Sequence, residues 1–226
     1  MAKSIMVVGL GRFGASVAHT LFQLGYDVLG IDTDEKAVQA SLGQLTYAVQ
    51  GDSTNETTLK ELGVSNFDAA IIAIGSDMQS SLMTAVLLAT LKVPLIVARA
   101  KDQLHGNTLQ RIGVNKVIYP EQEMGEFVAH SLFNPDVLEY MDLTPDFGIS
   151  KVRLPDPLAG LSLKEAGLGG TRDKYGLAVV AIKRGRDVTL APDEGEKLRK
   201  GDILVLAGKD ERMERWQKPK GSQEDT

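Results

Sequence analysis

The glycines near the start of the chain have the spacing of a phosphate-holding turn. Gly9, Gly11 and Gly14 follow an apolar run that begins at Ser4, and a helical pattern that includes Phe13 starts at once. In such a unit the first glycine permits a tight turn, the second lets a phosphate approach the backbone, and the third lets helix and strand pack closely. The helix also presents free N–H groups and the positive end of its dipole to an anion. The spacing therefore predicts a nucleotide-binding turn.

An acid at the end of the next apolar run favours a nucleotide with a free ribose. The run Val28–Ile31 ends in Asp32, close to the spacing of about 20 residues at which an acid binds ribose hydroxyls. We assign Asp32 to the ribose; the alternative is a helix-capping or loop acid. Asp34 follows with no Arg or Lys beside it. A 2′-phosphate would be repelled there, which disfavours NADP.

Arg12 is an unusual residue between the second and third glycines. Many dinucleotide folds carry a small or apolar residue there, which leaves room for the pyrophosphate. A guanidinium at this place is suited to pairing with extra terminal phosphates, on its own ligand or on that of a neighbouring subunit. The alternative is a solvated arginine whose charge opposes the helix dipole.

More polar and glycine residues follow later strands of the predicted sheet. Ligands of open α/β sheets bind at the carboxyl ends of the strands, so these residues belong to one edge. Arg99 is suited to a phosphate, and Glu121 to a divalent cation, Mg²⁺ or Ca²⁺, shared with phosphates. The remaining candidates are two residues where an adenine edge is expected, Asp52 and Ser53, and two after the fourth strand, Ile74 and Gly75.

Apolar runs alternate with helical patterns through the first half of the chain. This alternation predicts a parallel, doubly wound sheet covered on both faces, a Rossmann-type domain over residues 1–134. The expected strands are Ile5–Val8, Val28–Ile31, Tyr47–Gln50, Ala69–Ala73, Leu95–Ala98 and Lys116–Ile118. The expected helices are Phe13–Leu24, Glu35–Leu42, Glu56–Leu62, Met78–Leu91, Gln103–Ile112 and Gln122–Leu132.

The pattern changes after residue 134. Residues 135–148 are expected to form a crossover helix, at Val137–Met141, and a linker. Short strands separated by turns follow, with a small helix at Leu163–Ala166, and predict a small α+β domain over residues 149–213. Residues 214–226 are expected to be a polar, disordered tail.

Composition narrows the class of protein. The chain has 226 residues, a net charge of −5 and no cysteine. The charge argues against nucleic acid and anionic membrane surfaces as partners. Without cysteine, disulfides, thiolate metal sites and a cysteine nucleophile are excluded. No signal peptide or membrane helix is evident, so we expect a cytoplasmic protein that meets a membrane only through a partner.

Catalytic machinery is not evident in the sequence. His19, His105 and His130 all lie in helical patterns and are expected to be surface or packing residues. No Ser–His–Asp spacing, HExxH motif or Walker lysine is visible. A dehydrogenase needs a second domain that brings substrate to the nicotinamide, and the short C-terminal domain suits a sensor better. We therefore expect a regulatory binding protein rather than an enzyme.

Several segments together resemble one known family. VVGLGRFG, GIDTD, QGDSTNETTL, AIGSD, IVARA, VIYPEQEMG, YGLAVVAIKRG and GDILVLAG are similar to those of RCK (KTN plus TrkA-C) proteins, the cytoplasmic gating subunits of Ktr/Trk-type potassium uptake systems. The resemblance runs from Met1 to about Gly208, and the single copy of each domain is similar to the Ktr type. It implies a ring, usually an octamer built from dimers, docked under a membrane potassium-translocating subunit. It also implies ATP and ADP as ligands of the active and inactive ring.

The resemblance also implies roles for individual residues. Arg12 would reach a terminal phosphate across the dimer, and Glu121 would contribute to a cation site there. The three glycines would line the phosphates, Asp32 would bind the ribose, and Asp52 and Ser53 would lie near the adenine. Some relatives bind cyclic di-AMP in the C-terminal domain, where Arg172 and Pro192 match; Leu177 and Ala178 replace residues that are often polar there.

Two other classes of function share part of these features. An NAD-dependent oxidoreductase or an NAD(H)-binding redox sensor would use the glycines and Asp32, but has no use for Arg12 or Glu121. A transcriptional redox sensor would need a DNA-binding element, and no helix-turn-helix or basic stretch is apparent.

Overall fold

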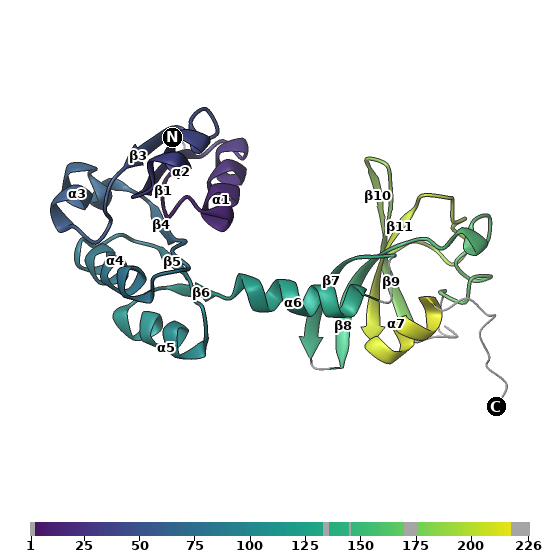
Figure 1. The fold of residues 1–226 in the computed structure, drawn as a ribbon. Helices are drawn as coiled ribbons and strands as arrows, with labels where there is room; N and C mark the ends of the chain where they lie inside the picture. The colour runs from purple at the N-terminus through teal and green to yellow at the C-terminus, as the bar shows by residue number, and fades with distance from the viewer. Residues whose placement is uncertain (1–2, 133–135, 145, 170–175, 218–226) are drawn as a thin grey trace. The chain divides into compact units, whose positions relative to one another are not determined.

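The computed structural model describes residues 3–132, 136–144, 146–169 and 176–217 of the chain (Figure 1). The chain divides into two compact units, Met1–Gln122 and Glu123–Thr226, and each is described by itself. In the described residues no helix is long and apolar enough to cross a lipid bilayer.

The first unit is built on a six-stranded parallel sheet in the order β3-β2-β1-β4-β5-β6. The order reverses between β1 and β4, which is the switch point at which open α/β sheets bind ligands. The strands are β1 (Ser4–Val8), β2 (Asp27–Asp32), β3 (Tyr47–Gln50), β4 (Ala69–Ile72), β5 (Ile96–Arg99) and β6 (Lys116–Ile118). The helices are α1 (Arg12–Gln23), α2 (Glu35–Ser41), α3 (Glu56–Glu61), α4 (Met78–Thr90) and α5 (Gln103–Ile112), with a 3₁₀ turn η1 (Val64–Asn66). A further helix, α6 (Pro120–Ser131), begins in the last residues of this unit and continues into the second. The predicted Rossmann-type architecture is confirmed.

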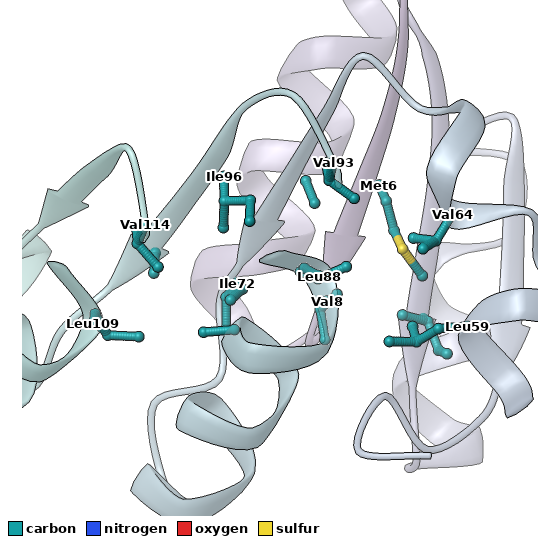
Figure 2. Packing of buried hydrophobic residues seen from close by; sticks show 14 of the residues in the cluster. Met6, Val8, Leu59, Val64, Ile72, Leu88, Val93, Ile96, Leu109 and Val114 are labelled. Carbon is teal, nitrogen blue, oxygen red and sulfur yellow. The ribbon is translucent and has the colours of Figure 1, made fainter. Parts of the chain in front are cut away.

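Side-chain alternation in the central strands explains why both faces of this sheet are covered. In β1, Met6 and Val8 pack into the cluster that contains α3, α4 and α5, whereas Val7 packs with α1 and α2. Successive side chains of a strand point to opposite faces, so an apolar run needs a helix layer on each side. Figure 2 shows the larger cluster, with Leu59, Leu88 and Leu109 from its three helices directed at the strands. Burying each leucine contributes about 1.5–3 kcal/mol.

Helix starts at the carboxyl edge of the sheet are capped in two different ways. The caps of α2, α3, α4 and α5 are Asp34, Asn55, Asp77 and Asp102, and each side chain accepts a backbone N–H of its helix. In contrast, α1 begins after Gly11, which offers no side-chain hydrogen bond. The first N–H groups of a helix have no intrahelical partner, so α1 is the helix in this set whose start is left available.

The second unit contains a five-stranded sheet in the order β10-β9-β11-β8-β7, with antiparallel neighbours. Its strands are β7 (Val137–Thr144), β8 (Phe147–Arg153), β9 (Leu177–Arg184), β10 (Asp187–Leu190) and β11 (Ile203–Lys209). A 3₁₀ turn η2 (Asp156–Leu158) follows β8, and a helix α7 (Asp210–Gln217) follows β11. One face buries an apolar cluster that includes Val152, Leu204 and Leu206. The small α+β fold predicted for this region is confirmed.

The expected crossover helix at Val137–Met141 is wrong. These residues belong to β7, which pairs with β8 from Val137 to Thr144. Val137 is buried, and from there to Met141 partly buried and exposed side chains alternate, as in a strand with one solvated face. The short window of VLEYM carries too few residues to distinguish period 2 from period 3.6.

Two other local predictions in this unit need correction. Leu163–Ala166 forms a turn rather than a helix, because Gly167 follows it at a left-handed φ of 76° and the chain reverses. The tail predicted to begin at residue 214 instead continues α7, whose Met213 and Trp216 are 4% and 5% exposed. The apolar pair at spacing three anchors the helix on the sheet. Residues 218–226 lie outside the described part.

Candidate nucleotide-binding site

Two of the three motif glycines are required by packing. Gly9 has a left-handed φ of 91°, and a Cβ there would lie 3.2 Å from the backbone of Ala73 and Ile74. Its N–H donates to the carbonyl oxygen of Ile31 at 2.8 Å, which joins the turn to β2. A Cβ on Gly14 would collide with the carbonyl oxygen of Gly9 and lie 2.9 Å from the Cβ of Ala73. These two glycines let α1 approach β1 and β4, as the sequence predicts.

Gly11 has no such packing role. Its φ of −63° and ψ of −177° are accessible to any residue, and a Cβ there would meet no protein atom within 4 Å. The space above Gly11 is therefore open, at the uncapped N-terminus of a 12-residue helix. A side chain here would fill the space that a phosphate needs in order to reach the helix N–H groups.

Asp32 lies at the end of β2, half-buried, and is held by the backbone. Its Oδ2 accepts the N–H of Leu10 at 2.6 Å, and its Oδ1 accepts the N–H of Asp34 at 2.9 Å. The bond from Leu10 orients the Asp32 side chain toward the glycine turn. Each oxygen of an ionised carboxylate can accept a further hydrogen bond, so both oxygens of Asp32 can still accept hydrogen bonds from a ligand. Asp34 caps α2 by accepting the N–H of Lys36 at 2.9 Å. The sequence did not reveal Leu10, because its contribution comes from the backbone.

Arg12 is exposed at the first position of α1. In the ranges that the structure describes, no carboxylate forms an ion pair with it. A cation at a helix N-terminus is disfavoured by the dipole, so the charge of Arg12 adds nothing to the stability of α1.

Arg99 and Glu121, predicted separately for a phosphate and a cation, form an ion pair with each other. The Arg99 guanidinium also lies 6.0 Å from the ring centroid of Phe13, and a Cβ on Gly75 would collide with it. Gly75 thus makes room for Arg99 across the end of β4. The two side chains are 21% and 63% exposed. A partly exposed pair of this kind contributes about 0–1 kcal/mol, so a ligand can compete for either charge.

The residues after β3 turn partly inward. Asp52 is exposed, and its Oδ1 accepts the N–H of Thr54 at 2.8 Å. Ser53 is 5% exposed, and its hydroxyl is hydrogen-bonded to that of Thr84 in α4 at 2.8 Å. Asp52 therefore remains accessible at this edge, whereas Ser53 joins the β3–α3 turn to α4. Ile74 is half-buried beside Gly75.

Two ionisable groups near this edge have shifted pKa values. The hydroxyl of Ser80 donates to Asp77 at 2.5 Å, and this bond lowers the pKa of that carboxyl. Burial lowers the pKa of His105, and the charge of Asp102 opposes that shift. His105 was predicted to be a packing or surface residue, and it is 2% exposed. The spacing Asp102-x-x-His105 resembles a capping box, which is the signal that would have revealed its hydrogen-bonding role.

The structure gives no complete metal cage for Glu121. In the described ranges no three His, Cys, Asp or Glu side chains gather as a metal-binding group. A cation at Glu121 would need ligands from outside this set, such as phosphate oxygens.

The predicted cyclic di-AMP residues belong to the second unit. Arg172 lies outside the described residues. Pro192 lines an open cavity of about 460 Å³ together with Ala178 and Glu194. Leu177 also contributes to the lining, so the described part of the cavity is apolar and acidic.

Comparisons with known proteins agree with the two-unit fold. Residues 5–120 match the TrkA-N domain and residues 149–220 the TrkA-C domain. The chain is 36% identical over 218 residues to the Ktr system potassium uptake protein C of Bacillus subtilis, covering 96% of this chain and 97% of the relative. It is 35% identical over 215 residues to the Ktr system potassium uptake protein A of the same organism, covering 95% and 96%.

Solved structures share the fold at lower identity. The GsuK RCK domain has a TM-score of 0.55 at 22% identity and covers 95% of this chain and 45% of that one. The GsuK channel bound to NAD has a TM-score of 0.51 at 23% identity, covering 95% and 38%. GsuK bound to ADP has a TM-score of 0.51 at 16% identity, covering 60% and 36%. The chain thus spans less than half of these structures, and the likeness concerns the fold.

Proposed function

This chain belongs to the family of proteins built from a TrkA-N and a TrkA-C domain, and from that premise we propose that it is a nucleotide-sensing regulatory subunit of a membrane potassium-uptake system. The observation that carries the proposal is the open space at Gly11, at the uncapped start of α1. Beside it lies the guanidinium of Arg12, which forms no ion pair with any carboxylate in the described part of the chain. Both features suit an anion with more phosphate charge than a single helix start neutralises.

Each group at this edge has a defined task in the proposed site. Backbone N–H groups of the glycine turn and α1 bind the phosphates, and Asp32 binds the ribose hydroxyls. Asp52 lies on the side of β3, where the adenine edge is expected. Phe13, Ile74 and Gly75 border the site, with Arg99 held across Gly75. We propose ATP and ADP as the ligands, with Mg²⁺ or Ca²⁺ contributing charge neutralisation beside Glu121.

Discrimination between ATP and ADP would make the nucleotide a switch. A ligand shifts a conformational equilibrium only by its difference in affinity for the two states. Arg12 supplies such a difference if it pairs with the terminal phosphate of ATP, which ADP lacks. The ion pair between Arg99 and Glu121 is weak and half-exposed. A phosphate can therefore compete for Arg99 and a cation for Glu121, which is a second source of difference in affinity between ATP and ADP.

The proposed assembly follows the relatives named Ktr system potassium uptake proteins. We propose that the chain forms a homo-oligomeric ring, an octamer built from dimers, and acts in the cytoplasm against a membrane-embedded potassium-translocating subunit. The expected role is gating without catalysis. Nucleic acid is not among the proposed partners, since the net charge is −5.

A second ligand, cyclic di-AMP, is proposed for the cavity of the C-terminal unit beside Pro192. The described lining offers apolar contacts at Leu177 and Ala178 but also the carboxylate of Glu194. The phosphates of the ligand would need a cation, a task assigned to Arg172. Replacing Arg172 by Ala should abolish cyclic di-AMP binding and leave ADP binding unchanged; retained binding would contradict this assignment.

The alternative ligand is NAD(H), because GsuK, which shares this fold, has been solved bound to NAD. A redox sensor of this kind would use the glycine turn and Asp32 without Arg12. Substitution of Arg12 therefore separates the two proposals.

The test compares ATP and ADP affinities of the wild type and the Arg12→Ala variant. Loss of charge-assisted hydrogen bonds worth about 1.5–3 kcal/mol should weaken ATP binding by roughly ten- to a hundredfold and ADP binding much less. The matched control is Arg111→Ala, which removes an exposed arginine from the last turn of α5. Unchanged ATP preference in Arg12→Ala would overturn the assigned role of this residue.

A further inference from the structure

The start of α5 has two neighbouring side-chain hydrogen bonds, one of which is made by an imidazole. The cap residue Asp102 accepts the N–H of His105 through Oδ1 at 2.8 Å, and Nδ1 of His105 accepts the N–H of Lys101 at 3.2 Å. This resembles a capping box, with histidine in the place usually taken by Glu or Gln, except that the side chain accepts the N–H of the residue before the cap rather than that of the cap itself. Because Nδ1 accepts a hydrogen bond, the ring is neutral and carries its proton on Nε2.

The surroundings of the ring oppose a second proton. His105 is 2% exposed, and its Nε2 has no hydrogen-bond partner in the described structure. The ring also lies at the positive end of the α5 dipole, where an imidazolium is disfavoured. Burial lowers the pKa of His105. A protonated ring could not accept the N–H of Lys101, so protonation must break this hydrogen bond.

The neighbouring elements offer little compensating charge. On its own turn the ring has Asp102, whose charge favours protonation, and the cation Lys101. α4, which packs on α5, has no ionisable side chain from Met78 to Thr90. β6 contributes Lys116, which is exposed, and the turn after β6 contributes Tyr119. The Tyr119 hydroxyl lies so close to Gly106 that a Cβ there would collide with it. β5 contributes Arg99, whose positive charge is paired with the carboxylate of Glu121.

The capped turn directly follows the strand that holds Arg99. Between them lie Ala100 and Lys101, and the N–H of Ala100 donates to the carbonyl oxygen of Ile118 at 2.9 Å. The backbone at this point directs Arg99 over Gly75 toward Phe13. Loss of the hydrogen bond at Lys101, two residues away, would loosen the backbone that sets the course of the Arg99 side chain.

We infer that His105 is a positioning residue of the nucleotide site, and that a proton on its ring and a nucleotide in the site exclude one another. The inference rests on the proposed nucleotide-binding function and adds proton sensitivity to it. Because coupling between two binding events is reciprocal, acid weakens nucleotide binding, and bound nucleotide makes the ring harder to protonate.

The experiment measures ADP affinity at pH 7.5 and pH 5.5 for the wild type, His105→Gln and the control His19→Gln. The amide oxygen of Gln accepts the N–H of Lys101 without titrating, so His105→Gln should match the wild type at pH 7.5. Because the pKa of His105 lies below 6.5, the wild type should lose up to about tenfold more affinity at pH 5.5 than His105→Gln. His19→Gln should behave as the wild type, and titration of ADP itself is common to all three.

An equal loss of affinity in the wild type and His105→Gln, at a pH where NMR shows the ring of the free wild type to be protonated, would overturn the inference while ADP binding at pH 7.5 stood. Absence of ADP binding in the wild type at pH 7.5 would instead overturn the proposed function, and this inference with it. A second measurement holds even if His105→Gln fails to fold. In the wild type, NMR titration of the His105 ring should give a lower pKa with saturating ADP than without it, and an unchanged pKa would refute the coupling.

Discussion

Replacing Gly11 by Ala should separate ligand binding from folding. The backbone of Gly11 is accessible to alanine, and the added Cβ meets no protein atom within 4 Å. Reduced freedom of the unfolded chain stabilises such a variant by about 0.4–1 kcal/mol. Alanine is a poorer N-cap than glycine by a similar amount, about 0.5–1 kcal/mol. The two effects oppose each other, so the free energy of unfolding should change by less than about 1 kcal/mol.

Nucleotide binding by the same variant should fall much more. The methyl group would occupy the space where a phosphate meets the start of α1, and loss of hydrogen bonds to a charged group costs about 1.5–3 kcal/mol. We expect ADP affinity to fall by at least tenfold. Gly14→Ala is the matched comparison, because its Cβ collides with Gly9 and crowds Ala73; it should lose about 1–3 kcal/mol of stability.

The assay combines urea unfolding with calorimetric titration of ADP for the wild type and both variants. Wild-type ADP affinity in Gly11→Ala would refute the assignment of Gly11 to a ligand. A loss of more than about 2 kcal/mol of stability in that variant would show that the residue is structural.

Substitutions at three more residues have defined outcomes. Arg184→Met leaves the 1% exposed Asp202 without its cation and should cost about 3 kcal/mol, read in urea from the fluorescence of Trp216, the only tryptophan in the chain. Burial raises the pKa of Asp202, but hydrogen bonds from Arg184 and the N–H of Arg199 hold it below 3.8. The stabilisation is therefore complete above pH 3.8 and lost as pH falls through the folded-state pKa, which a wild-type unfolding series checks; a flat profile there would contradict it. Trp216→Phe should cost roughly 1 kcal/mol and Trp216→Ala about 3–5 kcal/mol in thermal unfolding, whereas a neutral Trp216→Ala would show that α7 does not belong to the core. Asp32→Ala should weaken ATP and NADH alike by about tenfold or more in titrations, and unchanged binding of both would remove Asp32 from the site.

The parallel sheet could be predicted from the sequence because its signals are local. Each strand is a short apolar run, and each helix follows with a capping residue or a glycine stop at a readable place. The second unit was harder to predict. The segment VLEYM would bury similar residues whether it formed a strand or a helical turn. Its pairing with β8, which lies outside the segment, makes it a strand. Trp216 stands in a polar context, and burial against the sheet makes its segment a helix.

The candidate site was predictable in its membership and less so in its contacts. Strand ends fix which residues share an edge, so Gly11, Asp32 and Arg99 could be grouped from spacing alone. Pairing of Arg99 with Glu121 depends on the order of β5 and β6 in space. Burial of Ser53 depends on α4 lying over the β3–α3 turn. Such contacts join residues far apart in the chain and leave no pattern in the sequence.

The central claim, a site that distinguishes ATP from ADP, is tested most directly by calorimetric titration of the purified protein with ATP, ADP and NADH, with and without Mg²⁺. The account predicts micromolar binding of ATP and ADP, strengthening of ATP binding by the cation, and weak NADH binding. Tight NADH binding with little response to ATP would contradict the claim and make a redox sensor the better account of the site.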